Sequence, residues 1–320
     1  MNNPVDLLRR YRVVGIPVRG VAVSLAVATV AFSVLRFAPG DPVLAILGDQ
    51  ATPSAVEAMR KDLGLDGNVL VQYLRFLGDA SHGNLGTSLT SGTPVTRIIL
   101  DSIVPTLSLV MLTAVIALVV SVPVGLRLAL APDGVFSKVF RVIASLSLAT
   151  PGFFLGLLAL LLFAIRLGVA PVAGFDTEFP GALAYLWLPA IVICAQLVPI
   201  LARVFRSSVT RTLDEEFIEA AIVRGISRPR FLWHYLIRPS IAPTIALLGY
   251  VTGQLLGAAV MIEMVFSLPG IGTQLVQAVT TRDYPTVQGI MLVFGVIVVA
   301  ITTLSELLIG YLDPRVGVRQ

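Results

Sequence analysis

Six long stretches without a charged side chain constrain the fold of this chain more than any other feature. Five of them exceed the roughly 18–20 residues that a helix needs to cross about 30 Å of hydrocarbon. The first is shorter, but Arg19 and Arg36 flank it and their side chains can extend to the two interfaces. The pattern predicts an all-α polytopic membrane protein with six transmembrane helices. The uncharged stretches are 20–35, 102–126, 142–165, 179–202, 239–262 and 284–305.

The composition agrees with a membrane protein, since only 13% of the residues are charged and soluble domains carry about 25%. The single cysteine, Cys194, excludes an intrachain disulfide. The basic N-terminus followed by an apolar stretch also resembles a cleavable signal peptide. The long basic region, and the direct passage into an extended outer segment, favour an uncleaved first span.

The distribution of Lys and Arg predicts the orientation. If both termini face the cytoplasm, 16 of the 23 basic residues lie on that side, as the excess of positive charge in cytoplasmic loops requires. The net charge of +4 is then a signal of topology and needs no nucleic-acid partner. The expected segments are a cytoplasmic N-terminus 1–19, a first span 20–38, an extracytoplasmic subdomain 39–101, a membrane core 102–312 that contains a cytoplasmic loop 207–240, and a cytoplasmic tail 313–320.

The extracytoplasmic segment is too long for a simple loop, and its sequence predicts two short helices. Thr52 and Pro53 suit the cap and first turn of a helix over 54–63. A second helix is expected over 69–80, with one apolar face. These helices are compatible with a place on the membrane surface, with an external partner, or with a cap that packs on the bundle. The expected face consists of Leu70, Tyr73, Leu74 and Leu77.

Polar and adaptable side chains inside the expected spans are candidates for a substrate pathway. Gln196 lies in the fourth span, and Gln254 and Met261 lie in the fifth. Ordinary hydrogen bonds between helices explain both glutamines equally well. In the third span, Pro151 follows Thr150 and predicts a kink, either for packing or beside a pathway. The fifth span also carries a small-residue face that allows close helix contact, made of Gly249, Gly253 and Gly257.

The segment 214–243 is charged, although it lies between two apolar stretches. The spacing from Thr212 to Glu215 predicts a capping box at the start of a helix, which should run to about Arg224 and end at Gly225. Ser227 is expected to cap a second helix, with a proline in its first turn. A helix, a glycine turn and a second helix suit either a docking element for a partner or an amphipathic helix on the bilayer surface.

The motif Glu219-Ala220-Ala221, with Gly225 four residues later, resembles the EAA loop of ABC importer permeases. The rest of the chain resembles the B-subunit type of dipeptide, oligopeptide and nickel permeases over about 280 residues. Asn84 and the sequence Ile222-Val223-Arg224 depart from the usual family pattern. The matching features are PGDP at 39–42 with Gly48, LGLD at 63–66 with Gln72-Tyr73, Leu85-Gly86-x-Ser88, Pro94-Val95, Thr106, Pro151, Arg238, Pro243, Glu263-x2-Phe266-x2-Pro269-Gly270-x-Gly272, Arg282–Pro285 with Gln288-Gly289, and DPR at 313–315.

The resemblance implies a type I ABC importer permease fold in a bacterial inner membrane. It implies that the chain forms half of a pathway for peptides or related small solutes. The implied partners are membrane lipid, a second homologous permease, two ATPase subunits that carry ATP and magnesium, and an extracytoplasmic substrate-binding protein. No catalytic, cofactor-binding or metal-binding residue is expected in this chain. The residues implied in ATPase coupling are Phe217, Glu219, Ala220, Ala221, Arg224 and Gly225.

Two other classes of protein fit the sequence less well. An ion-driven secondary transporter or channel would carry ionisable residues inside its spans, and the six uncharged stretches hold none. An intramembrane hydrolase would need a nucleophile–base pair or a HExxH-type metal helix, but both histidines lie outside the expected spans and the sequence contains no such motif. Lys61 and Lys138, the only lysines, lack the preceding glycine-rich loop of a nucleotide-binding motif. We therefore expect a transporter subunit whose ATP hydrolysis takes place on a partner.

Overall fold

The computed structural model describes residues 20–33, 43, 52–62, 68–178 and 180–312. Every regular secondary-structure element in these ranges is helical, which confirms the predicted all-α class. The expected cytoplasmic termini, the PGDP turn and the LGLD motif lie outside the described residues. The chain forms two compact units, which we call unit 1 (1–104 and 270–300) and unit 2 (105–269 and 301–320).

Four helices are long and apolar enough to cross a membrane, and a bent helix pair adds a fifth if it counts as one span. A shorter apolar helix, Gly20–Ser33, corresponds to the expected first span. The predicted count of six spans is therefore not confirmed, although each uncharged stretch is mostly helical where the structure describes it. The four long helices are α5 (Val95–Leu130), α8 (Gly181–Leu213), α12 (Ala242–Val265) and α14 (Tyr284–Leu312), of which Tyr284–Leu304 meets the criterion.

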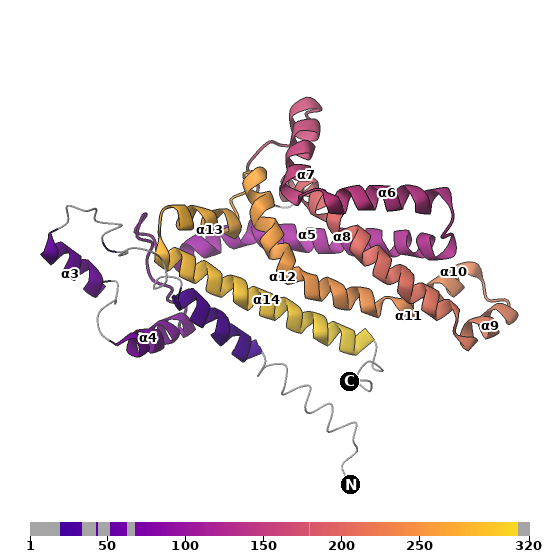
Figure 1. Cartoon of the computed structure of the whole chain (residues 1–320), viewed down its shortest axis with the longest axis horizontal. Helices are drawn as coiled ribbons and strands as arrows, with labels where there is room; N and C mark the ends of the chain where they lie inside the picture. Colours follow the sequence, from indigo (N-terminus) through magenta and orange to yellow (C-terminus); the bar gives the residue numbers. More distant parts are fainter. Residues whose placement is uncertain (1–19, 34–42, 44–51, 63–67, 179, 313–320) are drawn as a thin grey trace, which may run out of the picture. The chain divides into compact units, whose positions relative to one another are not determined.

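The third predicted span is broken at Pro151, where the sequence predicts a kink. It divides into α6 (Val135–Ala149) and α7 (Gly152–Ala159), and α7 continues as the π-helix η1 (Leu160–Arg166). The two parts are bent by 106°, and Figure 1 shows α7 turning away from α6. Pro151 has no N–H for the helix ladder, and its ring forces Thr150 into an extended conformation with ψ 131°.

The helices α5 and α8 are longer than the uncharged stretches that predicted them. The first turns of α5 contain Arg97 and Asp101, which approach each other to 3.9 Å. The helix α8 extends at its C-terminal end, where it continues past the apolar stretch to Leu213 and includes Arg203 and Arg206. Charge therefore marks where the apolar surface ends, while the backbone hydrogen bonds continue into the polar region.

Unit 1 contains the two short helices expected between the first and second spans. They are α3 (Pro53–Asp62) and α4 (Val69–Ser81), within two residues of the predicted bounds. The predicted cap is confirmed, because the amide of Ala55 donates to Thr52 Oγ1 at 3.4 Å.

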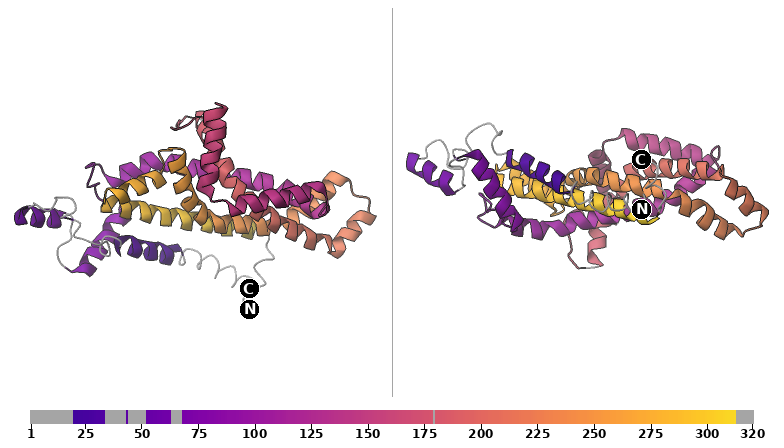
Figure 2. Two further views of the ribbon diagram at one scale, coloured as in Figure 1. Left: turned by 45° about the horizontal axis from the view of Figure 1, so that its top comes forward. Right: turned by 90° about the horizontal axis from the view of Figure 1, so that it is seen from below.

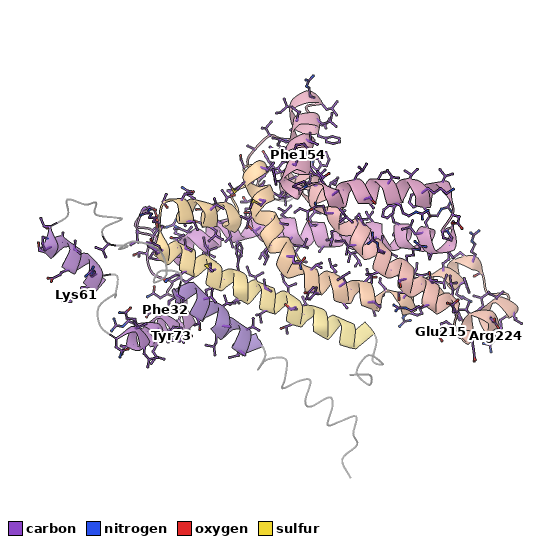
Figure 3. All side chains as sticks on the ribbon, viewed as in Figure 1. Phe32, Lys61, Tyr73, Phe154, Glu215 and Arg224 are labelled. Atoms are coloured by element: carbon purple, nitrogen blue, oxygen red, sulfur yellow. The ribbon has the colours of Figure 1, made fainter. Side chains whose placement is uncertain are left out.

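The predicted apolar face of α4 is only partly correct. Leu70 and Leu74 are exposed, whereas Gln72 is buried. The hydroxyl of Tyr73 lies 2.7 Å from Thr29 Oγ1, and its ring packs edge-on against Phe32 at 5.1 Å between centroids. Figure 3 shows these two rings together. The contact with the helix Gly20–Ser33 therefore selects the inward face of α4, and local periodicity alone did not.

A buried carboxylate organises the junction between α13 (Ile271–Thr280) and α14. Asp283 is 3% exposed and accepts four hydrogen bonds, from the hydroxyls of Ser88, Thr90 and Thr286 and from the amide of Leu89. These donors satisfy the charge in place of water. The carboxylate thus fixes the loop before α5 to the start of α14, above a core of Val95, Ile99, Ile271 and Ile290.

Replacing this carboxylate should destabilise the protein more than replacing an exposed one. We expect Asp283→Ala to cost about 3 kcal/mol, because three hydroxyls and one amide lose a charged acceptor. The matched control is Asp101→Ala, whose side chain is 74% exposed. Thermal unfolding of the purified chain in detergent measures both. Equal melting temperatures for the two variants would contradict the assignment.

Candidate functional site

The charged segment forms a compact helical turn at the end of α8. It contains α9 (Glu216–Val223), α10 (Arg228–Arg230), the π-helix η2 (Phe231–Ile237) and α11 (Arg238–Ser240). Both views in Figure 2 show it beyond the last turn of α8. The predicted order of helix, glycine turn and helix is confirmed. We call the segment 214–240 the charged turn.

Gly225 ends α9 in the left-handed conformation, with φ 62°. Its amide donates to the carbonyl oxygen of Ile222 at 2.9 Å, and the amide of Ile226 reaches Ala221 at 3.4 Å. Other residues adopt this backbone conformation only at a cost. The glycine therefore reverses the chain between α9 and α10, as its place in the sequence predicts.

The predicted capping box at the start of this turn is wrong. Thr212 lies inside α8, where its hydroxyl donates to the carbonyl of Ser208 at 3.0 Å. The N-cap of α9 is Glu215, and neither it nor Ser227, the N-cap of α10, makes a side-chain cap bond. Thr212 instead lies 2.9 Å from the hydroxyl of Ser240. Since α8 continues to Leu213, Thr212 belongs to α8 and connects it to α11.

The inner face of α9 rests on the same chain. Ile218 and Ala221 are buried, and the ring of Phe217 lies 6.4 Å from that of Tyr235 in η2. Tyr235 in turn stacks on Phe231 at 6.2 Å. These contacts fix α9 to η2, so its orientation is set before any partner arrives.

The outer face of α9 is exposed and includes bulky apolar side chains. Val223 is 87% exposed and Ile222 is 64% exposed. Figure 3 labels Glu215 and Arg224 at the two ends of the helix. Of the six residues implied in coupling, Ala221 faces the chain itself, and the others are exposed: Phe217, Glu219, Ala220, Arg224 and Gly225.

Gln196 supports the bend between α6 and α7. Its amide nitrogen donates to the carbonyl of Thr150 at 2.8 Å and reaches that of Ser147 at 3.5 Å. The hydroxyl of Ser147 donates back to the carbonyl of Ala195 in α8 at 2.6 Å. These bonds satisfy backbone carbonyls that the proline break leaves without partners.

Gln254 and Met261 lie on an exposed stripe of α12. The side chain of Gln254 makes no hydrogen bond with any residue that the structure describes. The glycine face is divided, since Gly249 is buried while a Cβ at Gly257 would meet open space. The exposed members of the stripe follow helical spacing and are Tyr250, Gln254, Gly257, Met261 and Met264.

A fully buried carboxylate in unit 2 was missed from the sequence as a structural feature. Glu263 is 0% exposed, and Oε1 accepts a hydrogen bond from the hydroxyl of Thr106 at 2.5 Å. The bond joins α12 to α5. Glu263 directly follows an uncharged stretch, and a solvated side chain would suit this position equally well. The neighbouring sequence therefore does not predict that Glu263 is buried. Within the described ranges, no group of three metal-ligating side chains is found.

Comparison with known proteins identifies the family. A model described as "Binding-protein-dependent transport system inner membrane component" matches residues 121–318, and the N-terminal model of the same system matches residues 8–110. The chain belongs to this family. It is thus an inner-membrane permease of the ABC importer class, as its motifs predict.

Relatives and a solved structure agree with this assignment. A putative peptide transport system permease of Brucella abortus is 35% identical, over 93% of this chain and 96% of its own length. A nickel import system permease of Staphylococcus aureus is 34% identical, over 92% and 88%. The inward-facing MetNI methionine ABC transporter is 15% identical, with a TM-score of 0.53 over 68% of this permease and 97% of that chain. The last comparison supports the type I permease fold.

The two glutamines of this permease should respond differently to substitution. We expect Gln196→Leu to cost about 1 kcal/mol of stability, because the carbonyl of Thr150 loses its donor in an apolar environment. Gln254→Leu is the matched control and should leave stability unchanged. Cys194 is buried and lies two residues from Gln196, so maleimide labelling of this sole cysteine during heating reports unfolding. If Cys194 became labelled at the same temperature in both variants, the role of Gln196 in supporting the bend would be contradicted.

Proposed function

We propose that this permease forms half of the translocation pathway of an ATP-driven importer for di- or oligopeptides or related small solutes. The names of the relatives support this substrate range, since they include peptide and nickel permeases. The proposed complex contains a second homologous permease, two ATPase subunits and an extracytoplasmic binding protein. ATP and magnesium bind on the ATPases, and this chain carries neither a cofactor nor a catalytic site.

The observation that carries the proposal is the exposed apolar outer face of α9. A helix of eight residues is marginal by itself in water, yet this one is fixed through Phe217 and Ile218 and presents Ile222 and Val223 outward. Exposed apolar side chains in such a group mark a contact surface. We assign this surface to a cleft in the ATPase, with Glu219, Ala220 and Arg224 beside it.

In this proposal, the contacts of the charged turn transmit force into the spans. Phe217 packs on Tyr235, so displacement of α9 moves η2. The hydroxyls of Thr212 and Ser240 join α8 to α11, and α8 also packs against α12. We propose that closure of the ATPase pair moves α9 and that these contacts convert the movement into a change from inward-open to outward-open spans.

The proposed topology places this turn in the cytoplasm of a bacterial cell, together with both termini. The segment 39–101 then faces outward, where a binding protein delivers substrate, and 102–312 forms the membrane core. Gln254 and Met261 contribute to the pathway in this proposal, through the exposed stripe of α12. Gln196 lines the same pathway in this proposal, at the bend between α6 and α7.

Substitutions of Gly225 should reduce transport in proportion to the backbone strain that they introduce. Gly225→Pro should abolish transport, because proline fixes φ near −65° and removes the amide that bonds Ile222. Gly225→Ala should cost only about 1 kcal/mol, since a Cβ there meets open space. Uptake by reconstituted complexes and membrane insertion are measured in parallel.

The control for the alanine variant is Gly78→Ala, which also meets open space but has no left-handed φ. It should leave uptake unchanged. The related variant Ala221→Trp should abolish uptake, because this buried residue is seated against the chain and a large ring would displace α9. Normal uptake by Gly225→Pro would contradict the coupling assignment.

Purification of the intact complex tests the function itself. A second permease and ATPase subunits should co-purify with the wild-type chain, and ATPase stimulation by a panel of loaded binding proteins should identify the substrate. Val223→Glu should reduce the recovered ATPase about tenfold or more, because it places a charge in an apolar contact. Leu70→Glu, a charge at an exposed leucine of α4, should leave recovery unchanged.

Two outcomes would contradict this proposal. Full recovery of the ATPase with Val223→Glu and Ala220→Trp would assign α9 to the bilayer surface or another partner. A stable homo-oligomer that transports substrate without an ATPase would favour the ion-driven alternative.

A further inference from the structure

A basic cavity in unit 2 lies between the last turns of α5, one face of α6 and the second half of α8. Its volume is about 220 Å³. Three arginines line it, Arg141 from α6 and Arg203 and Arg206 from α8, together with the exposed hydroxyl of Ser145. The cavity lies on the side that the distribution of basic residues predicts to be cytoplasmic. It is separate from the outer face of α9.

Among the residues that the structure describes, no carboxylate forms an ion pair with any of the three arginines. Arg141 donates from Nε to the backbone carbonyl of Ser137 at 3.3 Å. Like charges around one cavity repel each other unless an anion lies between them. The planar guanidinium group matches phosphate oxygens in a bidentate geometry, so the cavity suits a phosphate ester.

An apolar surface on α6 indicates which phosphate ester. Beside the arginine of this helix, apolar side chains recur at helical spacing and remain exposed in the described structure. A soluble anion would make no contact with this apolar surface, whereas the acyl chains of a lipid can pack against it in the bilayer. The stripe contains Val135, Val139, Val142, Ile143 and Leu146, which are 50–78% exposed.

We propose that the cavity binds the phosphate headgroup of an anionic phospholipid whose acyl chains lie along α6. Basic pockets between transmembrane helices on the cytoplasmic side are suited to such headgroups. The headgroup connects α6 to α8 through Arg141 on one helix and Arg203 and Arg206 on the other. Because α8 continues directly to Leu213, the bound lipid stiffens the helix that leads into the charged turn.

Lipid titration of the purified complex tests this site. The probes are phosphatidylglycerol, which is anionic, and phosphatidylcholine, which is neutral overall, and native mass spectrometry counts the bound molecules. Wild-type complex should bind phosphatidylglycerol about tenfold more tightly or better, and Arg203→Gln/Arg206→Gln should lose about tenfold or more of that affinity. Size-exclusion chromatography verifies that the variant remains assembled.

The matched control removes the same charge from the same region. Arg127 and Lys138 are exposed and do not line the cavity, so Arg127→Gln/Lys138→Gln should change the affinity by less than about twofold. If the arginine variant does not fold, Ser145→Trp supplies the test. This side chain is exposed and lines the cavity, so the ring should fill it and weaken binding while all three arginines remain.

Four outcomes would overturn the proposal. Equal affinity for the two lipids would show that no anion is selected. Equal losses in test and control variants would assign the effect to overall charge. Displacement of phosphatidylglycerol by millimolar inorganic phosphate alone would indicate a soluble anion. Loss of the ATPase from Arg203→Gln/Arg206→Gln, with lipid binding unchanged, would assign these arginines to the partner subunit.

Discussion

The need to satisfy backbone hydrogen bonds away from water is the constraint on which the rest of this permease depends. Helices meet that need within themselves, and each interruption requires a donor or acceptor from elsewhere. At the bend between α6 and α7, that donor is Gln196, which bonds the carbonyl of Thr150. At the end of α9, the chain reverses through Gly225, and backbone amides of the turn donate to carbonyl oxygens of α9. At the bend between α6 and α7, the hydrogen-bond donor is a side chain of a neighbouring helix. At the end of α9, the donors are backbone amides of the turn itself.

The same reasoning explains why polar groups join the helices of unit 2. A hydroxyl pair joins α8 to α11, and a carboxylate on α12 accepts a hydrogen bond from Thr106 of α5. Such bonds have fixed partners and directions, unlike apolar contacts between lipid-like side chains. A permease must move its helices as bodies, and a few directional bonds between neighbours are well suited to keep those bodies intact during the movement.

Much of this architecture could be predicted from the sequence, and the failures have physical reasons. The uncharged stretches located the long helices because burial in hydrocarbon excludes charge, but they did not give helix ends. The resemblance identified the family, and Gly225 was placed correctly because its backbone conformation is local. The cap at Thr212, the inward face of α4 and the burial of Glu263 depend on contacts with distant segments. Periodicity over one helix does not contain that information.

The carboxylate of Asp283 has a consequence for how the protein is made. Its partner Ser88 precedes it by 195 residues, so during synthesis the loop before α5 emerges long before its acceptor exists. The loop cannot acquire its final hydrogen bonds until the ribosome has completed most of the chain. Assembly of unit 1 is therefore a late event of biogenesis, because the loop before α5 reaches its final hydrogen bonds only after the start of α14 has been synthesised.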